Sequence, residues 1–292
     1  MIKVEICPVC KSKKLHPYKK VKDYSVSKET FQLMKCTECG LIITSPRPID
    51  EELPKYYISE DYVSHNDSSK GLINSIYQRV KKITLRQKEA LISSYQTKKT
   101  LLDIGCGTGD FIKQCELNNW SVFGLEPDEG ARKIALQKVP GKVEPGESLF
   151  TLKKSFGTIT LWHVLEHVSN LNEYFNQFNR LLEDNGRLII ALPNPESPDA
   201  EHYNSYWAAY DVPRHLFHFT KNNISMLAQN HGFELEDVKP MLFDSYYVSM
   251  LSEKYKSGSI FYAAINGLKS NVKARNKINH SSLIYIFSKK QA

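Results

Sequence analysis

The order of segments along the chain predicts an α/β fold: a mostly parallel sheet flanked by helices, with a small additional module at the N-terminus. Two observations carry this prediction. From about residue 100 onward, strand-like runs alternate with amphipathic helix-like runs, as they do in chains that build parallel sheets. Before that region, two CxxC pairs stand close to the N-terminus.

Length and composition agree with such a fold. The 292 residues can bury a core for one large domain and a small one. A hydrophobic content of 41% and a charged content of 24% are ordinary for a soluble globular protein, and no apolar run approaches the length of a membrane span. The first residues, MIKVEICPVC, lack the apolar stretch of a secretory signal, so we expect a cytoplasmic location. The net charge of +7 suggests an anionic partner without naming one.

The N-terminal module is predicted from four cysteines, in Cys7-Pro-Val-Cys10 and Cys36-Thr-Glu-Cys39. Each short turn aims two thiolates at one point, and two such turns suit a tetrahedral zinc ion. Incidental thiols are the alternative, and a redox role is disfavoured because neither pair opens the helix of a βαβ unit. We therefore expect a zinc ribbon over residues 1–45, with a hairpin over residues 11–35 and a structural zinc ion, because four thiolates fill its coordination shell.

A linker is predicted over residues 46–70, because three prolines and a serine-rich end follow the second cysteine pair. Within it, Tyr56, Tyr57 and Tyr62 either anchor the linker on the next domain or serve as ordinary packing residues. The large domain is expected over residues 71–292. It opens with an amphipathic helix, in which apolar residues recur at helical spacing from Leu72 onward.

Strands and helices of the large domain are then expected in alternation. The expected strands are LLDI (101–104), WSVFGLEPD (120–128), FGTITLW (156–162), GRLIIALPN (186–194), FELEDVKP (233–240) and LIYIFSKK (283–290). One helix begins at Asp110, and the others are EGARKIALQK (129–138), LNEYFNQFNRLLEDNG (171–186) and KNNISMLAQNHG (221–232).

The turn after the first of these strands has glycine at alternate positions, namely Gly105, Gly107 and Gly109. Because these residues have no side chains, the backbone can approach a ligand closely. Its pattern is GxGxG, whereas a dinucleotide-binding turn has GxGxxG. Asp110 lies where a phosphate would have to be, so the ligand is expected to present a neutral or cationic group, such as an amino acid moiety beside a sulfonium. The next strand ends at Glu126, whose carboxylate can accept both hydroxyl protons of a ribose.

These motifs carry a family resemblance. DIGCGTG, the following GLEPD, FGTITLWHVLEHV and GRLIIALPN resemble the class I S-adenosylmethionine-dependent methyltransferases, in particular the group near quinone and sugar methylation, over residues 98 to 240. The resemblance implies a Rossmann-like, doubly wound sheet of seven strands and S-adenosylmethionine as cofactor. It also implies a set of cofactor-binding residues: Asp103, Gly105, Cys106, Gly107, Thr108, Gly109, Glu126, Pro127, Glu147, Trp162 and His163.

The segment His163-Val164-Leu165-Glu166-His167 matches HxxEH, a pattern of zinc proteases. That reading requires one long helix, whereas here the apolar strand ITLWH runs straight into the motif. We therefore place Trp162 and His163 at the rim of the strand, beside the sulfur of the cofactor. Glu166 and His167 are expected to start the next helix, with His167 as a partly buried structural residue.

Methyl transfer depends mostly on alignment, and it needs a general base only when the acceptor keeps its proton. The candidates for that base are His163, and His215 and His218 in AAYDVPRHLFHFT. For the last two, structural hydrogen bonding in a loop is an equal alternative.

Three functions remain open at the level of the sequence. The first is methylation of a small-molecule or carbohydrate-linked acceptor, which we favour. The second is methylation of RNA gripped by the zinc ribbon. The basic composition favours this hypothesis, and the absence of an NPPY or PC motif weakens it. The third is a non-catalytic scaffold or sensor that binds zinc and cofactor. Residues 251–282, rich in lysine, could form a basic lid or a plain solvated surface.

Overall fold

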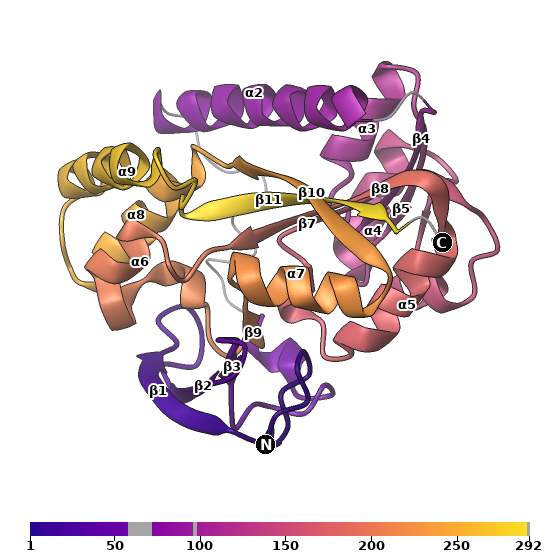
Figure 1. Ribbon diagram of the computed structural model, residues 1–292. Coiled ribbons are helices and arrows are strands. Elements are labelled where there is room, and N and C mark those ends of the chain that lie inside the picture. The colour runs from indigo at the N-terminus through magenta and orange to yellow at the C-terminus, as the bar shows by residue number, and fades with distance from the viewer. Residues whose placement is uncertain (58–71, 96–97, 291–292) are drawn as a thin grey trace.

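The protein, seen here as a computed structural model, is described over residues 1–57, 72–95 and 98–290 (Figure 1). Tyr62 and most of the predicted linker lie outside the described residues. A seven-stranded sheet crosses the large domain in the order β10-β11-β8-β7-β4-β5-β6. Its strands are β4 (Thr100–Ile104), β5 (Ser121–Leu125), β6 (Val143–Glu144), β7 (Phe156–Trp162), β8 (Leu182–Pro193), β10 (Phe233–Pro240) and β11 (Ser282–Lys289).

The sheet is parallel except for β11, which runs antiparallel to both β8 and β10. Two apolar clusters cover its faces. On one face, α5 (Leu171–Leu181) and α7 (Lys221–Asn230) contribute Phe175 and Leu227. On the other, α2 (Leu72–Tyr95), α3 (Asp110–Leu117) and α4 (Glu129–Lys138) contribute Ile92, Ile112 and Ala135. The predicted Rossmann-like, doubly wound architecture is confirmed.

Several predicted boundaries hold, because α4, β7 and β10 begin and end at the predicted residues. Two differ. The helix predicted over 171–186 ends at Leu181, because Leu182 is already paired with Phe156 in the sheet. Glu166 and His167 do not start that helix: they lie in the separate turn η3 (Leu165–His167), which ends in extended backbone at Val168, and α5 begins only at Leu171.

The N-terminal cysteines are held by a second, four-stranded antiparallel sheet, in the order β1-β2-β3-β9. Its first strands are β1 (Leu15–Lys22), β2 (Thr30–Cys36) and β3 (Ile42–Thr44), and its last, β9 (Phe217–His218), comes from the large domain. Ile42 pairs with His218, and Thr44 Oγ1 donates a hydrogen bond to the carbonyl oxygen of His215 at 2.7 Å. The domain division at residue 45 stays a prediction, because this sheet joins both sides of it.

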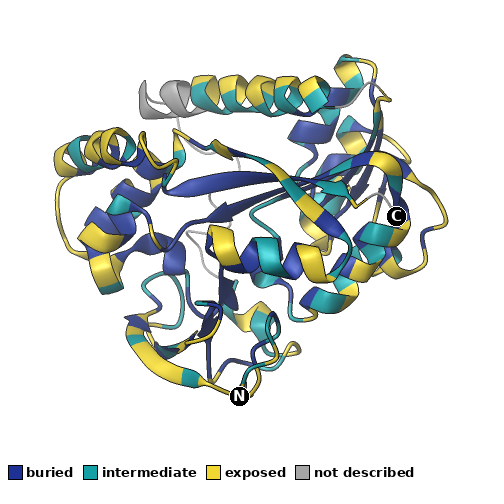
Figure 2. Ribbon diagram, in the orientation of Figure 1, coloured by how far each residue is buried: buried dark blue, intermediate teal, exposed yellow. Residues whose placement is uncertain are grey.

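Between β10 and β11 the chain forms a helical hairpin of α8 (Asp244–Tyr255) and α9 (Ile260–Ala274), at the left edge of Figure 1. The predicted basic lid, residues 251–282, covers the end of α8, all of α9 and the segment that leads to β11. The helix α6 (Pro198–Tyr203) and the short turns η4 (Asn204–Tyr206) and η5 (Ala208–Tyr210) lead from β8 to β9. Figure 2 shows the central strands of the sheet buried and α9 largely exposed. Among the described helices, none has the length and hydropathy needed to cross a membrane.

Candidate active site

The glycine turn joins β4 to α3, with φ angles of +70° at Gly105, +54° at Gly107 and +79° at Gly109. A Cβ on Gly105 would lie 2.5 Å from Val164 Cγ2, and one on Gly109 would lie 2.9 Å from Ala135 Cβ. At Gly107, by contrast, nothing lies within 4 Å of that position. Packing therefore explains two of the glycines, while the third leaves open space against bare backbone, as a ligand cradle requires.

Glu126 follows β5 directly and turns its carboxylate to the glycine turn. Its Oε2 accepts a hydrogen bond from the Gly107 backbone N–H at 2.7 Å, and its Oε1 accepts one from the Asp128 N–H at 2.9 Å. Burial raises the pKa of Glu126, while these two backbone donors oppose the rise. A carboxylate has about four lone-pair positions, so two remain for hydroxyl groups of a ligand.

Asp103, in β4, lies beneath the turn. It is buried and accepts a hydrogen bond from Thr160 Oγ1 at 2.6 Å. Burial raises the pKa of Asp103 to about 7, against the effect of Thr160 and of the Lys88 ammonium. Lys88 comes from α2 and lies 4.3 Å from the ring centroid of Trp162. Sequence reasoning missed this lysine, because a lysine on an amphipathic helix has the pattern of a solvated residue.

The remaining predicted cofactor residues surround the turn. Cys106 is buried beside Gly124, where a Cβ would lie 2.7 Å from its sulfur. Thr108 Oγ1 donates to Asp110, whose carboxylate also pairs with Lys81 and Lys138 at 2.8 and 2.7 Å. Pro127 packs against the turn η2 (Gly146–Phe150), which carries the exposed Glu147. Their roles at the cofactor stay predictions.

His163 follows β7 with φ +58°, an unusual conformation for a residue with a side chain, and it lies between two carboxylates. Its Nε2 is 3.1 Å from Asp244 Oδ2, and its Nδ1 is 3.5 Å from Glu166 Oε1. Burial opposes the positive charge, but the interactions with these two acids outweigh burial and raise the pKa of His163 to about 9. Asp244, the first residue of α8, was missed because its partner is distant in sequence.

Behind His163, three polar side chains meet: Glu166, His167 and His215 place one ligand atom each within 4.8 Å of one another. Glu166 is 1% exposed, and neither of its carboxylate oxygens has a hydrogen-bond partner among the described residues. His167 Nδ1 is 3.0 Å from the Tyr57 hydroxyl, so this tyrosine of the predicted linker contacts the large domain. The cluster is close enough to share one cation.

The other two predicted bases lie between the large domain and the N-terminal module. His215 is buried, and its Nδ1 donates to the Ala209 carbonyl oxygen at 2.9 Å, which leaves Nε2 facing Glu166 at 4.0 Å. His218 is buried in β9, and burial holds its pKa well below the ordinary value. The structure thus brings His163 and His215 to the same acid, Glu166, but it does not bring His218 to that acid. Catalytic roles for all three stay predictions.

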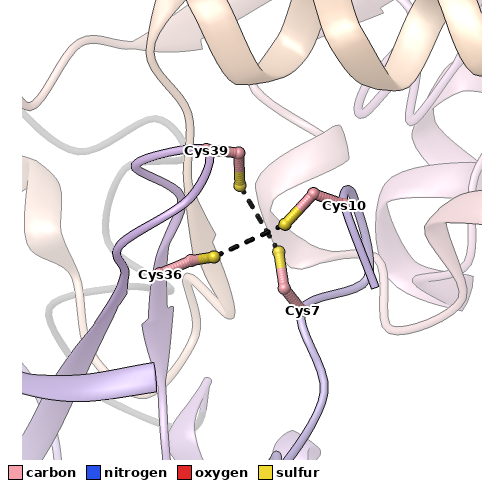
Figure 3. A group of neighbouring side chains, drawn as sticks. All are labelled: Cys7, Cys10, Cys36 and Cys39. Carbon is pink, nitrogen blue, oxygen red and sulfur yellow. Dashed lines mark hydrogen bonds between the residues drawn. The ribbon is translucent and has the colours of Figure 1, made fainter. Parts of the chain in front are cut away.

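The four cysteines converge from the two knuckles (Figure 3). The sulfurs of Cys7 and Cys39, and those of Cys10 and Cys36, are 3.5 Å apart. A tetrahedral ion with zinc–sulfur bonds of about 2.3 Å would hold its sulfurs roughly 3.8 Å apart, so the cluster matches the geometry of a four-thiolate zinc site. Cys7, Cys36 and Cys39 also belong to the apolar cluster on one face of the large sheet, so the knuckles pack against that domain.

Fold and site together define the class: a class I S-adenosylmethionine-dependent methyltransferase domain, with an open glycine turn and an acid after the second parallel strand. A family model described as "Methyltransferase domain" matches residues 64–238. The chain belongs to this methyltransferase domain family.

Curated relatives match part of the chain. An uncharacterized methyltransferase of Alkaliphilus oremlandii is 31% identical over 35% of this chain and 50% of its own length. An uncharacterized protein of Methanocaldococcus jannaschii is 31% identical over 58% of this chain and 61% of its own. A ubiquinone biosynthesis O-methyltransferase of Pelagibacter ubique is 29% identical over 49% and 65%. The chain thus spans between half and two thirds of the length of these relatives.

Among solved structures, the magnesium protoporphyrin IX methyltransferase of Synechocystis has a TM-score of 0.53 at 13% identity, covering 82% of this chain and all of that one. A methyltransferase of Archaeoglobus fulgidus has a TM-score of 0.50 at 20% identity, covering 71% of this chain and 94% of that one. At such identities the likeness shows the fold.

The turn gives a first prediction. Gly107→Ala is expected to fold with a modest loss of stability, about 1–2 kcal/mol for a side chain at positive φ. It should bind S-adenosylmethionine at least tenfold more weakly, because its methyl group fills the open space. Gly141→Ala, also at positive φ with nothing within 4 Å, is the matched control and should bind normally. Calorimetry and thermal melting separate the two effects, and normal binding by Gly107→Ala would contradict the cradle.

Proposed function

We propose that the protein transfers the methyl group of S-adenosylmethionine to a small-molecule or carbohydrate-linked acceptor. The observation that carries this proposal is the open space at Gly107 directly beside the carboxylate of Glu126. The turn would hold the methionine part of the cofactor, and Glu126 its ribose. Asp103, Cys106 and Thr108 would support the turn, and Pro127, Glu147 and Trp162 would surround the rest of the cofactor.

The charges of the site suit a cationic cofactor. Asp103, Glu126, Glu166 and Asp244 supply carboxylates around the turn and the end of β7, and the carboxylates of Glu166 and Asp244 keep low pKa values through His163. A buried group of acids attracts a sulfonium more strongly than a surface group would, because the effective dielectric constant is lower. Bound S-adenosylmethionine supplies a methyl carbon that is already activated, so the protein's task is to align the acceptor with it.

His163 is the proposed contact to the acceptor. Both of its ring nitrogens face acids in this structure, so the imidazole is protonated at neutral pH and both of its N–H groups already point toward carboxylates. It could accept a proton only after one of these pairs opens. We propose that Asp244 and Glu166 orient the ring, and that His215 and His218 support Glu166 from behind.

This arrangement has a pH signature. The folded-state pKa of His163, about 9, lies above its ordinary value of 6.5. Its ion pairs therefore stabilise the protein fully below pH 6.5, and this contribution is lost as the pH rises through 9. The melting temperature of the wild type should fall over this range relative to that of His163→Gln. His16→Gln, at an exposed position in β1, is the control and should follow the wild type; parallel curves for wild type and His163→Gln would rule out the pairs.

One relative bears on the chemical class of the acceptor. The name of the Pelagibacter ubique protein places it in ubiquinone biosynthesis, which supports a small acceptor for this chain. Four thiolates also need a reducing compartment, which supports the cytoplasmic location that we propose.

The deciding experiment incubates the purified protein with methyl-labelled S-adenosylmethionine and a fractionated cell extract. Label in small molecules or glycolipids would support the proposal. Label in RNA that disappears after nuclease treatment would replace the proposal with RNA methylation. Tight cofactor binding without label in any fraction would favour a scaffold or sensor.

A further inference from the structure

Helix α9 carries its large apolar side chains outward. Phe261 and Val272 are 67% and 66% exposed, whereas the positions that α9 buries hold small residues such as Ala263, Gly267 and Ala274. A Cβ on Gly267 would lie 2.8 Å from the ring of Tyr246, so close packing on α8 requires these small residues. An ordinary surface helix buries its large apolar residues and exposes polar ones. Helix α9 is therefore amphipathic with its apolar side toward the outside.

The exposed apolar surface continues over the whole hairpin. Of the nineteen exposed large apolar side chains in the described part of the chain, eleven lie between Leu242 and Ile278. We call the exposed side chains of residues 242–278 the hairpin face. Figures 1 and 2 show α9 at the periphery of the molecule, with exposed residues along its length. Exposed apolar side chains concentrated on one hairpin in this way indicate an interaction site.

The charges on the hairpin face have one sign. Its exposed cations include Lys256, Lys269, Lys273, Arg275 and Lys277. The segment has two acids, and neither is available to balance them. Asp244 pairs with His163, and Glu253 is buried, where it accepts a hydrogen bond from Tyr203 at 3.1 Å. The face thus combines aromatic and aliphatic side chains with a cationic border.

A groove opens on the same face, between the end of β10 and the two helices, with a volume of about 730 Å³. Its walls include Val238, Phe243, Tyr246 and Val272, with Arg275 among them. Phe243, in the wall of this groove, directly precedes Asp244, the partner of His163, in the chain.

We propose that the hairpin face docks on the surface of a lipid bilayer that contains anionic headgroups. Aliphatic and aromatic side chains enter the boundary between headgroups and acyl chains, and lysines bind the phosphates. A second copy of the chain is a poorer occupant, because a two-fold contact through this face would bring the same cations together. A nucleic acid would match the charge but would leave aliphatic residues such as Val272 without a partner. The proposal goes beyond methyl transfer and does not depend on it.

The test is co-sedimentation of the full chain with vesicles, which requires neither cofactor nor acceptor. Vesicles of equal parts phosphatidylcholine and phosphatidylglycerol should bind the protein at least tenfold more tightly than vesicles of phosphatidylcholine alone. This preference should shrink as salt is added, because exposed charges are screened.

Two variants examine the two components of the face. Phe261→Ser should weaken binding to the mixed vesicles about tenfold, since it removes a large apolar side chain that would enter the membrane. Leu117→Ser, 68% exposed at the end of α3, is the matched control and should bind as the wild type. Lys269→Glu with Lys273→Glu should abolish the preference for anionic vesicles, while Lys3→Glu, far from the hairpin in sequence, should preserve it.

Three outcomes would overturn the proposal. The first is equal sedimentation of the wild type with and without mixed vesicles. The second is equal binding by the wild type and Phe261→Ser. The third is a dimer in solution, detected by sedimentation velocity, that dissociates in Phe261→Ser and does not bind vesicles, because the face would then be a contact between copies. None of these outcomes bears on the transfer of methyl groups, which the labelling experiment tests separately.

Discussion

Replacing Glu126 with alanine is expected to weaken the binding of S-adenosylmethionine about 100-fold, because a charged acceptor of two hydroxyl protons is lost. The carboxylate lies at the end of β5 and already holds the Gly107 N–H, so it is fixed in position before a ligand arrives. A prepositioned acceptor loses little entropy on binding, which is why a single side chain has so large an effect. Isothermal calorimetry measures the change directly.

The matched control for this variant is Glu144→Ala. Glu144 is exposed at the end of β6, and its backbone carbonyl, not its side chain, accepts the Glu126 N–H at 3.0 Å. Its removal should leave binding unchanged. Glu126→Gln keeps one oxygen to accept the Gly107 N–H and should fall between wild type and Glu126→Ala. If Glu126→Ala binds the cofactor with wild-type affinity while it remains folded, the ribose contact is wrong.

The second large effect concerns the N-terminal module. The wild type is expected to hold one zinc ion per chain, and Cys36→Ser is expected to lose it, because a three-thiolate site holds the ion far less well. The module should then lose its structure, since the metal supplies much of the folding free energy of such ribbons. Elemental analysis measures the metal, and thermal melting measures the stability.

Cys115→Ser provides the control for this loss. Cys115 is also a buried cysteine, but it lies in α3, outside the four-cysteine cluster. This variant should lose some stability and keep its zinc. Full zinc content in Cys36→Ser would show that the ligand set is different from Cys7, Cys10, Cys36 and Cys39.

Local pattern was enough to predict much of this fold. Helix α4 has an Asp128 cap and regular spacing, and β7 is a run of apolar and β-branched residues, so each could be predicted with both ends. The glycine turn and Glu126 could be predicted as well, because their chemistry is written in adjacent residues. The sequence could not indicate that Leu182 leaves the helix for the sheet, since an apolar residue suits both and only its pairing with Phe156 decides.

The missed parts of the site depend on contacts between distant segments. Lys88 reaches Trp162 from a helix that has the pattern of an ordinary solvated surface, and Asp244 reaches His163 from a hairpin with no recognisable motif. The hairpin itself contradicts the usual rule, because its large apolar residues face outward. A periodicity argument assigns such residues to the core, and only the three-dimensional arrangement shows where they lie.

The shared strand β9 has a consequence for how the chain matures. During synthesis the cysteine knuckles leave the ribosome early, but the sheet that carries them lacks its last strand until His218 has emerged. The first segment to be made is therefore among the last to be completed, and its final pairing spans most of the polypeptide. Pairings of such long sequence separation form slowly. Until then, the edge of β3 that receives β9 stays unpaired.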